Sequence, residues 1–256
     1  MRRVARLLAQ LSLERACRLF LDPWRIPLEL TRPRALSPSD AILSLFPDVS
    51  PAAVQACLLA FLSNNRFFSE LNTLYVEKRH RRADCRDKKA FLYLAVRYAR
   101  PRTIVETGVF DGISSAVILQ ALSDNGGGML ISIDLPAVET IKNSTDRMGG
   151  TVLPPGCPPG WAIPAYLREQ HRLVLGDSRT ILSSLLEEYP HIDVFFHDSL
   201  HSYEHQLFEY TTAWPKLCEG GVLLSDDIFW SAAFHKFCKQ MKKRYVWSNC
   251  LGAVRK

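Results

Sequence analysis

The sequence predicts an α/β fold, a doubly wound, mostly parallel sheet of seven strands preceded by an N-terminal helical extension. Between residues 103 and 254, short β-rich segments alternate with helical ones, which is typical of a parallel sheet covered by helices. Residues 103–115, TIVETGVFDGISS, indicate a strand, a glycine loop and a helix, the first βα unit of a nucleotide-binding sheet. Hydrophobic residues make up 47% of the 256 residues, which is enough for a full core.

The extension is predicted to be helical. Apolar residues at helical spacing, with arginines opposite, predict an amphipathic helix over residues 3–20. Packing against the main domain or a second subunit explains such a helix, and contact with a membrane surface is the alternative. After a proline-punctuated connector (residues 23–38), Ser50 and Pro51 predict a helix start, and a further helix is expected over residues 67–78. We expect an extension over residues 1–86 and a main domain over residues 87–256.

The main domain opens with a helix over residues 88–99, after which strands and helices alternate. The expected strands are residues 103–106, 129–134, 172–175, 192–197, 222–225, 244–247 and 251–254. The expected helices between them are residues 114–122, 179–188, 203–214 and 230–242. Residues 136–170, which include PPGCPPGWAIP, break this alternation and are expected to form a lid or substrate-binding insertion.

Composition and charge narrow the class of protein. The seven cysteines are odd in number and contain no C-x-x-C, which argues for a reducing compartment and against a disulfide framework or a cysteine zinc site. No apolar run approaches the ~18 residues that span a bilayer. The basic N-terminus has no continuous apolar segment and no A-x-A-like cleavage site, so we expect a cytoplasmic protein.

The net charge of +6 is unevenly distributed along the chain. Residues 1–100 hold 18 Lys and Arg against 9 Asp and Glu, whereas residues 101–256 hold 14 against 17. A solvated basic face explains this excess, and an anionic substrate, an acidic partner or a membrane surface are the functional alternatives. Nucleic acid is not expected, because exposed aromatics do not alternate with the basic residues in any recognisable module.

The loop after the first strand has the spacing E-x-G-x-x-x-G and lacks the G-x-G-x-x-G pattern that seats a pyrophosphate. An acid at its start, Glu106, suits a cationic or neutral ligand and favours S-adenosylmethionine over NAD. A purely structural βα turn is the alternative. Asp134 ends the second strand, where an acid reaches the ribose hydroxyls of an adenosine ligand. Asp177 and Ser178 follow the third strand, where they meet an adenine amino group or cap the next helix.

A second constellation follows the fourth and fifth strands. The fourth ends in His197 and Asp198, and the fifth is followed by Asp226 and Asp227. Three carboxylates that converge at one sheet edge are costly without a cation, and all-oxygen ligation favours Mg²⁺. Such an ion would hold a substrate hydroxyl while a nearby histidine removes its proton.

Simpler explanations of these residues also stand. Asp226 or Asp227 could cap the helix that follows. His201 and His205 are spaced i, i+4 and could bind zinc together with Asp198. His197 could be a hydrogen-bonded histidine of the core, and Tyr203 could pack in the core or contact the substrate.

The motifs ETGVFDG, SIDLP, GWAIPAYLREQ, LVLGDS, FFHDSLHSYEH and WPKLCEGGVLLSDDI resemble those of class I S-adenosylmethionine-dependent methyltransferases. The resemblance is to the branch of macrolide-sugar O-methyltransferases and cephalosporin-hydroxylase-like proteins, and it covers about residue 88 to the C-terminus. It implies a Rossmann-like methyltransferase fold, Mg²⁺ on Asp198, Asp226 and Asp227, and His201 as general base. The cofactor would be contacted by Glu106, Gly108, Phe110, Gly112, Ser114, Asp134, Leu135, Asp177, Ser178 and Asp198.

Two residues depart from that pattern. His197 replaces an apolar residue, and Asp226 stands where glutamate is common, which shortens one metal ligand. We therefore expect an S-adenosylmethionine-dependent, Mg²⁺-dependent O-methyltransferase that acts on a hydroxyl of a small glycosyl or polyketide-like metabolite. The alternatives are a metal-dependent hydroxylase or hydrolase on the same scaffold, with Fe or Zn on His201 or His205, and a non-catalytic adaptor. Homo-oligomerisation and membrane contact by the N-terminal helix are left open.

Overall fold

The computed structural model describes residues 33–83, 85–136 and 153–256. Ala35–Lys256 form one compact unit. The helix expected over residues 3–20, most of the proline-punctuated connector and the first part of the 136–170 insertion lie outside the described residues. Within the described residues, no helix is both long and apolar enough to cross a membrane.

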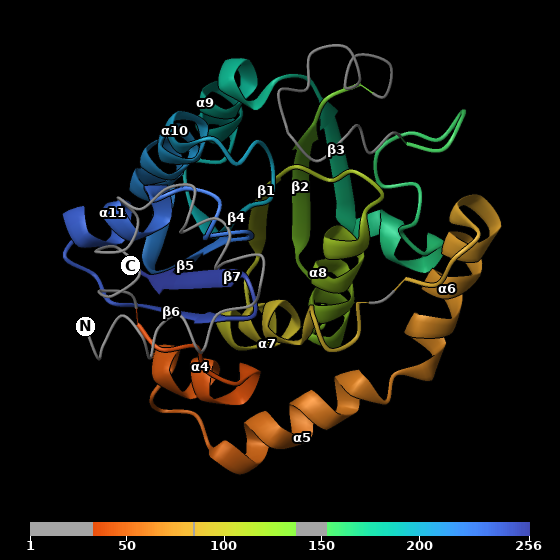
Figure 1. Cartoon of the computed structure of the whole chain (residues 1–256), viewed down its shortest axis with the longest axis horizontal. Coiled ribbons are helices and arrows are strands. Elements are labelled where there is room, and N and C mark those ends of the chain that lie inside the picture. The colour runs from red at the N-terminus through yellow and green to blue at the C-terminus, as the bar shows by residue number, and fades with distance from the viewer. Residues whose placement is uncertain (1–32, 84, 137–152) are drawn as a thin grey trace, which may run out of the picture. The chain divides into compact units, whose positions relative to one another are not determined.

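A seven-stranded sheet forms the centre of the unit (Figure 1), as the sequence predicts. Its strands run in the order β3-β2-β1-β4-β5-β7-β6. The first five in this order are parallel, whereas β7 pairs antiparallel with β5 and with β6. The bounds are β1 (Thr103–Thr107), β2 (Met129–Asp134), β3 (His171–Leu175), β4 (Ile192–His197), β5 (Leu217–Ser225), β6 (Tyr245–Ser248) and β7 (Leu251–Arg255).

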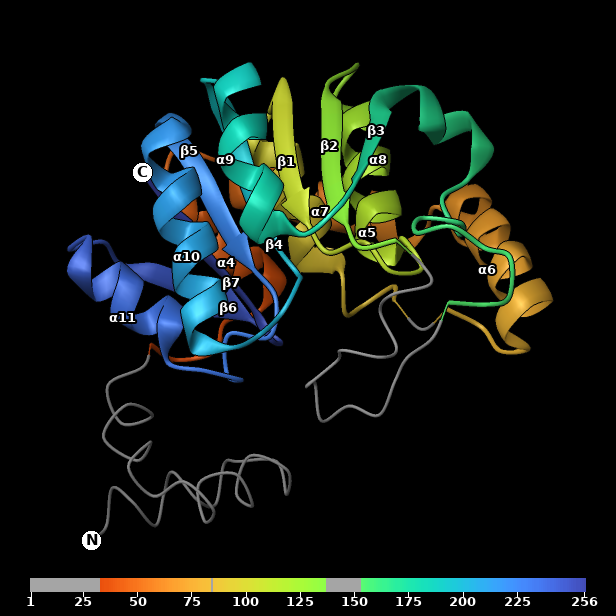
Figure 2. The same ribbon diagram turned by 90° about the horizontal axis from the view of Figure 1, so that it is seen from above.

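Helices cover both faces of the sheet (Figures 1 and 2). On one face α7 (Ala90–Ala99) and α8 (Ile113–Asp124) pack over strand residues such as Ile104 and Phe196. On the other face α9 (Ser178–Glu188), α10 (Tyr203–Ala213) and α11 (Ala233–Gln240) pack over Val105 and Phe195. Successive strand residues therefore enter different cores, because side chains alternate across a strand.

The described part of the extension belongs to the first of these cores. It comprises α4 (Pro38–Leu45), α5 (Pro51–Leu62) and α6 (Asn65–Arg79), and α5 begins after Ser50 as predicted. Buried side chains from all three helices, among them Ile42, Phe61 and Leu71, share a continuous apolar cluster with α7, α8 and the sheet. The boundary expected at residue 86 thus falls inside one packed core. Two short 3₁₀ helices, η2 (Ala165–Gln170) and η3 (Trp214–Lys216), complete the unit.

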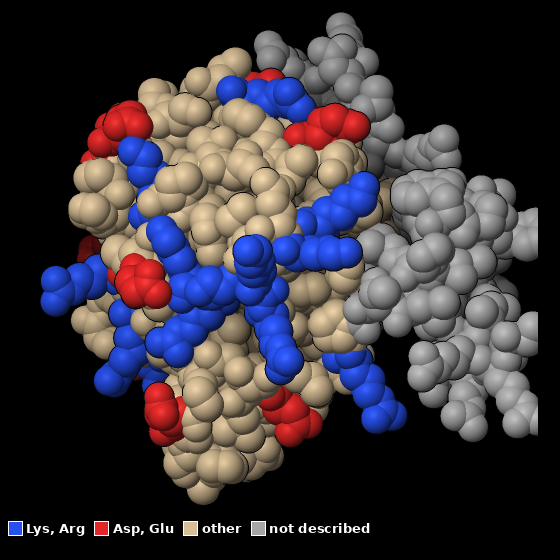
Figure 3. Space-filling view, turned by 90° about the vertical axis from the view of Figure 1, so that its left-hand side faces the viewer, with Lys and Arg blue, Asp and Glu red and all other residues tan. Residues whose placement is uncertain are grey.

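A band of basic side chains covers the face that carries α11 (Figure 3). Five of these are exposed on α11 and the residues directly after it, namely Lys236, Lys239, Lys242, Lys243 and Arg244. Residues 228–256 contain seven Lys and Arg and no Asp or Glu. The overall −3 of residues 101–256 conceals this local excess, so the basic charge is not confined to the first hundred residues.

Candidate active site

The candidate site lies at the carboxyl edge of the sheet, where β1 and β4 are neighbours and the strand order reverses direction. Ligands of doubly wound sheets bind at this position. Glu106 lies near the end of β1, Asp134 at the end of β2, and Asp198 and Asp226 directly after β4 and β5. The structure therefore brings the predicted strand-end acids to one edge.

The glycine loop packs tightly against other parts of the chain. Gly108 has φ +84°, and a Cβ added there would lie 2.1 Å from the carbonyl oxygen of Asp198. Gly112 has φ +90°, and its Cβ would lie 2.7 Å from the Cα of Gly160. These positions need glycine because protein backbone, rather than only a ligand, approaches them closely. Phe110, between the two, is also left-handed, at φ 52°.

Asp134 anchors the same loop. Its Oδ2 accepts the backbone N–H groups of Val109 (3.1 Å) and Phe110 (2.7 Å), and its Oδ1 accepts that of Leu135 (2.7 Å). Burial raises its pKa above the ordinary value. A carboxylate offers about four acceptor positions, so three N–H contacts leave room for a ribose hydroxyl. The ribose contact stays a prediction.

Glu106 is buried, and only one of its two carboxylate oxygens has hydrogen-bond partners among the described residues. Its Oε2 accepts the hydroxyls of Ser115 (2.7 Å) and Ser132 (2.6 Å), whereas its Oε1 is buried with no hydrogen-bond partner among the described residues. Burial raises the pKa of Glu106 to about 7. Because unpaired buried polar atoms are rare, Oε1 points to a donor that a ligand or water would supply.

The two residues after β3 have separate roles. Asp177 is the N-cap of α9 and accepts the N–H of Arg179 at 2.9 Å, as the capping alternative expected. The hydroxyl of Ser178 turns away from the edge and donates to Glu209 at 2.6 Å. Their contacts with adenine therefore stay predictions.

Exposed apolar side chains border the same edge. Leu135 is 38% exposed, Leu175 is 52% exposed and Leu200 is 40% exposed. They lie at or shortly after the carboxyl ends of β2, β3 and β4. Large apolar side chains left open at the ligand edge of a sheet indicate a surface for a flat or apolar ligand group.

A lysine lies among the clustered carboxylates. The ammonium of Lys89 lies 2.7 Å from Asp226 Oδ2 and 4.0 Å from Asp198 Oδ2, and Asp198 Oδ2 also accepts the hydroxyl of Ser114 at 3.1 Å. Asp226 Oδ1 accepts the backbone N–H of Asp227 at 3.0 Å.

Burial sets the pKa values of this cluster together with the neighbouring charges. Burial and the charge of Asp226 raise the pKa of Asp198 well above its ordinary value. Burial opposes ionisation of Asp226 and Lys89 as well. Their mutual attraction outweighs it, lowering the pKa of Asp226 and raising that of Lys89.

The expected magnesium site does not fit this arrangement. Among the described residues, no group of three or more His, Cys, Asp or Glu side chains is placed to hold a metal ion. Asp226 Oδ2 is already engaged by the ammonium of Lys89. Asp226 and Asp227 also do not cap α11, because its N-cap is Ala232.

His201 lies beside the carboxylates. Its side chain is 12% exposed, and its Nε2 has no hydrogen-bond partner among the described residues and lies 4.0 Å from Asp198 Oδ1. Burial and the neighbouring His197 lower the pKa of His201 to about 3, so its imidazole is neutral at neutral pH. Since α10 begins at Tyr203 and His205 Nε2 lies 2.9 Å from Glu209, His201 and His205 do not form the zinc pair considered above.

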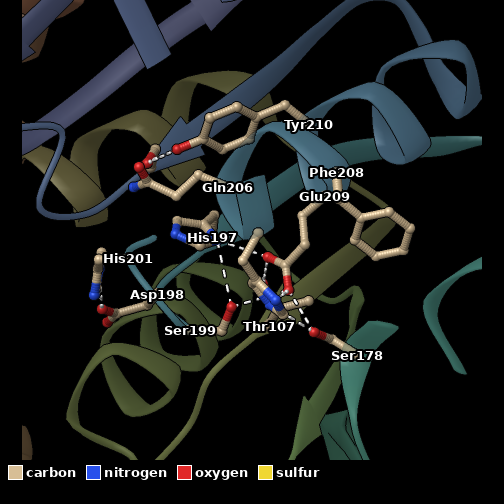
Figure 4. A network of polar contacts seen from close by, with 12 residues as sticks. Thr107, Ser178, His197, Asp198, Ser199, His201, Gln206, Phe208, Glu209 and Tyr210 are labelled. Carbon is tan, nitrogen blue, oxygen red and sulfur yellow. Dashed lines mark hydrogen bonds and ion pairs between the residues drawn. The ribbon is translucent and has the colours of Figure 1, made fainter. Parts of the chain in front are cut away.

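Glu209, a buried carboxylate on α10, lies on the opposite side of His197 from His201 and Asp198 (Figure 4). It is fully buried, and its Oε2 lies 2.6 Å from His197 Nδ1. Although burial opposes its ionisation, His197 and the hydrogen bonds hold the pKa of Glu209 well below its usual range. Four further side chains lie within hydrogen-bond distance of its two oxygens, namely Thr107 (2.5 Å), Ser178 (2.6 Å), Ser199 (2.9 Å) and His205 (2.9 Å).

This network explains why a histidine, His197, stands where the methyltransferase pattern has an apolar residue. A histidine can replace an apolar residue at the end of β4 because Glu209 faces it from α10. His197 is thus a hydrogen-bonded core histidine, and its ring packs edge-on against that of His201, with ring centres 5.3 Å apart. Sequence reasoning missed Glu209, although its i, i+4 spacing from His205 places both on one helix face.

Asp111 is a second residue that the sequence reasoning missed. It is buried in the glycine loop and lies 2.8 Å from the hydroxyl of Tyr75 and 2.5 Å from the guanidinium of Arg79, both on α6. It also accepts Trp161 Nε1 from the insertion at 2.8 Å. The loop, the extension and the described part of the insertion therefore meet at one carboxylate.

Comparisons with known proteins agree with this geometry. Residues 105–228 match a family model described as a methyltransferase domain. No curated protein sequence matches the chain significantly.

Similar solved structures cover most of the chain at low sequence identity. An O-methyltransferase from Bacillus cereus, in complex with SAH, has a TM-score of 0.53 and 14% identity, covering 80% of this chain and 97% of its own. TomG from Streptomyces achromogenes, an O-methyltransferase involved in tomaymycin synthesis, in complex with SAM, has a TM-score of 0.53 and 15% identity, with coverages of 80% and 96%. The SAH-bound methyltransferase PaMTH1 from Podospora anserina has a TM-score of 0.52 and 15% identity, with coverages of 73% and 87%.

Proposed function

Because this chain has the class I S-adenosylmethionine-dependent methyltransferase fold and carries a methyltransferase domain over residues 105–228, we propose that it methylates a hydroxyl group of a small metabolite. The observation that carries this proposal is His201, a neutral imidazole placed beside Asp198 at the ligand edge of the sheet, whose buried Nε2 has no hydrogen-bond partner among the described residues. A glycosyl or polyketide-like acceptor is the substrate class we propose.

The chain's own residues divide the work. Glu106, Asp134 and the glycine loop would hold the cofactor, with Asp134 accepting from its ribose hydroxyls and Glu106 Oε1 accepting from a polar group of the cofactor or a water. Leu135 and Leu175, both exposed at this edge, would line the adenine position. When bound, S-adenosylmethionine supplies an electrophilic methyl group and a neutral leaving sulfide.

His201 acts as the general base. It accepts the hydroxyl proton while the oxygen–methyl bond forms and the sulfur–methyl bond breaks. The negative charge of Asp226 favours the protonated form of His201 and so stabilises the imidazolium that results.

Mg²⁺ has no part in this mechanism, because Lys89 engages the carboxylate that would bind the ion.

The described part of the insertion supports enclosure of the acceptor. Gly160 and Ala162 donate backbone hydrogen bonds to Phe110 and Asp111 of the glycine loop, at 2.8 and 3.0 Å. Residues 160–162 of the insertion thus lie directly against the glycine loop.

Calorimetric titration of S-adenosylhomocysteine into the full chain tests the cofactor, with NAD as the control ligand. We expect saturable binding of S-adenosylhomocysteine and none of NAD. A panel of hydroxylated acceptors with S-adenosylmethionine, monitored by release of S-adenosylhomocysteine, then identifies the substrate. Absence of S-adenosylhomocysteine binding would overturn the proposal.

A further inference from the structure

We propose that Lys89 is an internal counter-cation for Asp198 and Asp226 and takes the position that a divalent metal would otherwise occupy. This inference rests on the proposed function, because it concerns how the same site balances its charge. Its first support is geometric. Lys89 Nζ lies 2.7 Å from Asp226 Oδ2 and 4.0 Å from Asp198 Oδ2, so one ammonium contacts both strand-end carboxylates.

The second support is the local cost of a lysine at this position. Lys89 is the N-cap of α7, has no side-chain capping bond, and brings a positive charge to the positive end of the helix dipole. Ser, Thr, Asp or Asn at an N-cap stabilises a helix relative to a residue that cannot cap it. A lysine at this unfavourable N-cap position needs a compensating interaction elsewhere, and the carboxylates of Asp198 and Asp226 supply it.

The third support is that other groups of the protein also donate hydrogen bonds to these two carboxylates. Asp226 Oδ1 accepts the N–H of Asp227, and Asp198 Oδ2 accepts the hydroxyl of Ser114. Mg²⁺ requires oxygens at about 2.0–2.1 Å in near-octahedral geometry. A divalent ion on these oxygens would also stand next to the ammonium, and like charges at that distance repel strongly.

An ammonium can also contribute to catalysis directly. It has three N–H donors, of which Asp226 takes one. A remaining donor can hold the acceptor oxygen of the substrate beside His201 and stabilise negative charge on it. The sequence resemblance assigns this role to a metal, whereas here a residue preceding α7 supplies the charge.

Competition between Lys89 and a metal can be measured without a substrate or cofactor. The probe is Mn²⁺, and the readout is the thermal unfolding midpoint of the full chain in millimolar Mn²⁺ against EDTA. We expect no shift for the wild type. For Lys89→Met we expect a lower midpoint in EDTA that Mn²⁺ raises by about 2–4 °C, because a ligand that binds only the folded state stabilises it.

Matched variants separate charge from structure. Lys89→Arg keeps the positive charge, so its midpoint should not respond to Mn²⁺. Lys88→Met removes the charge of an exposed lysine one residue earlier, and its midpoint, like that of the wild type, should not respond to Mn²⁺. If Lys89→Met does not fold, Lys89→Gln, which keeps a hydrogen-bond donor, replaces it.

Two results would overturn the inference. One is a Mn²⁺ shift in the wild type as large as that of the Lys89 variant, since the metal and the ammonium would then bind without competition. The other is a Lys89 variant that Mn²⁺ does not stabilise, since Lys89 would then not occupy a cation position. Titration of S-adenosylhomocysteine into the same samples tests the proposed function separately, because the Mn²⁺ readout requires no cofactor.

Discussion

Two carboxylate sites lie near the end of β4, and they differ in how their charge is balanced. Glu209 has five side chains within hydrogen-bond distance and is fully buried. Asp198 and Asp226 share one ammonium and remain partly exposed, at 25% and 19% of their side chains. The first site is closed and stabilises the fold, whereas the second keeps capacity for a ligand. A cluster of polar side chains is therefore not enough to identify an active site. The candidate is the Asp198 and Asp226 site, whose carboxylates remain partly exposed.

Glu209→Ala breaks the closed site and should have the largest effect. It removes the carboxylate that holds His197 and leaves buried donors unpaired. We expect a loss of about 3–5 kcal/mol in the free energy of unfolding, measured by urea denaturation at pH 7. Asp198→Asn is the control in the open site and should change that free energy by less than about 1 kcal/mol. Equal losses in the two variants would contradict the comparison.

His201→Ala acts only on the open site. We expect turnover to fall about 10²- to 10⁴-fold, because the general base is lost, while S-adenosylhomocysteine affinity stays within about twofold. Steady-state kinetics and calorimetry measure the two quantities. His205→Ala removes a contact of Glu209, so it should lower the free energy of unfolding and reduce turnover much less than His201→Ala does. Loss of cofactor binding in His201→Ala would show that His201 is not the base.

Glu106→Gln sharpens the comparison through pH. Since the pKa of Glu106 is about 7 in the folded state against 4.5 ordinarily, the folded chain keeps a proton that the unfolded chain releases between these values. The wild type therefore loses stability as pH rises from about 4.5 to 7, and the variant lacks this loss. We expect the variant to gain up to about 3 kcal/mol relative to the wild type between pH 4 and 8, measured by urea denaturation. A pH-independent difference would show that the pKa is not raised.

Single hydroxyl deletions should give the smallest effects. Thr107→Val removes a buried donor to Glu209, and we expect a loss of about 1.5–3 kcal/mol in the free energy of unfolding. Ser114→Ala removes the donor to the partly exposed Asp198, and here we expect less than about 1 kcal/mol. Denaturation of both variants under the same conditions makes the measurement. A larger loss for Ser114→Ala would reverse the assignment of closed and open sites.

Most of the sheet was predictable from the sequence. Met129–Asp134 and Ile192–His197 have the predicted bounds, because each is an apolar run ended by a polar residue. β5 begins at Leu217, five residues before the prediction, since Gly220 and Gly221 weaken the strand pattern and a register shift interrupts its pairing with β4. The two C-terminal strands also fall within one residue of their predicted positions.

The site was predictable only where topology determines it. Acids at the ends of parallel strands meet at one edge, so Asp134, Asp198 and Asp226 could be placed together. Their partners could not be placed, because Lys89 and Asp226 are 137 residues apart and no local pattern relates them. Lys89 was expected only as part of the helix over residues 88–99, and Glu209 only as part of the helix over residues 203–214.

The meeting point at Asp111 has a consequence for biosynthesis. The ribosome synthesises the chain from its N-terminus, so Tyr75 and Arg79 emerge before the glycine loop, and Trp161 emerges 50 residues after Asp111. A nascent chain can therefore neutralise this carboxylate with α6 as soon as the loop appears, long before the sheet is complete. Deleting α6 would leave the glycine loop without its first partners, so we expect that the C-terminal part does not fold as an independent unit.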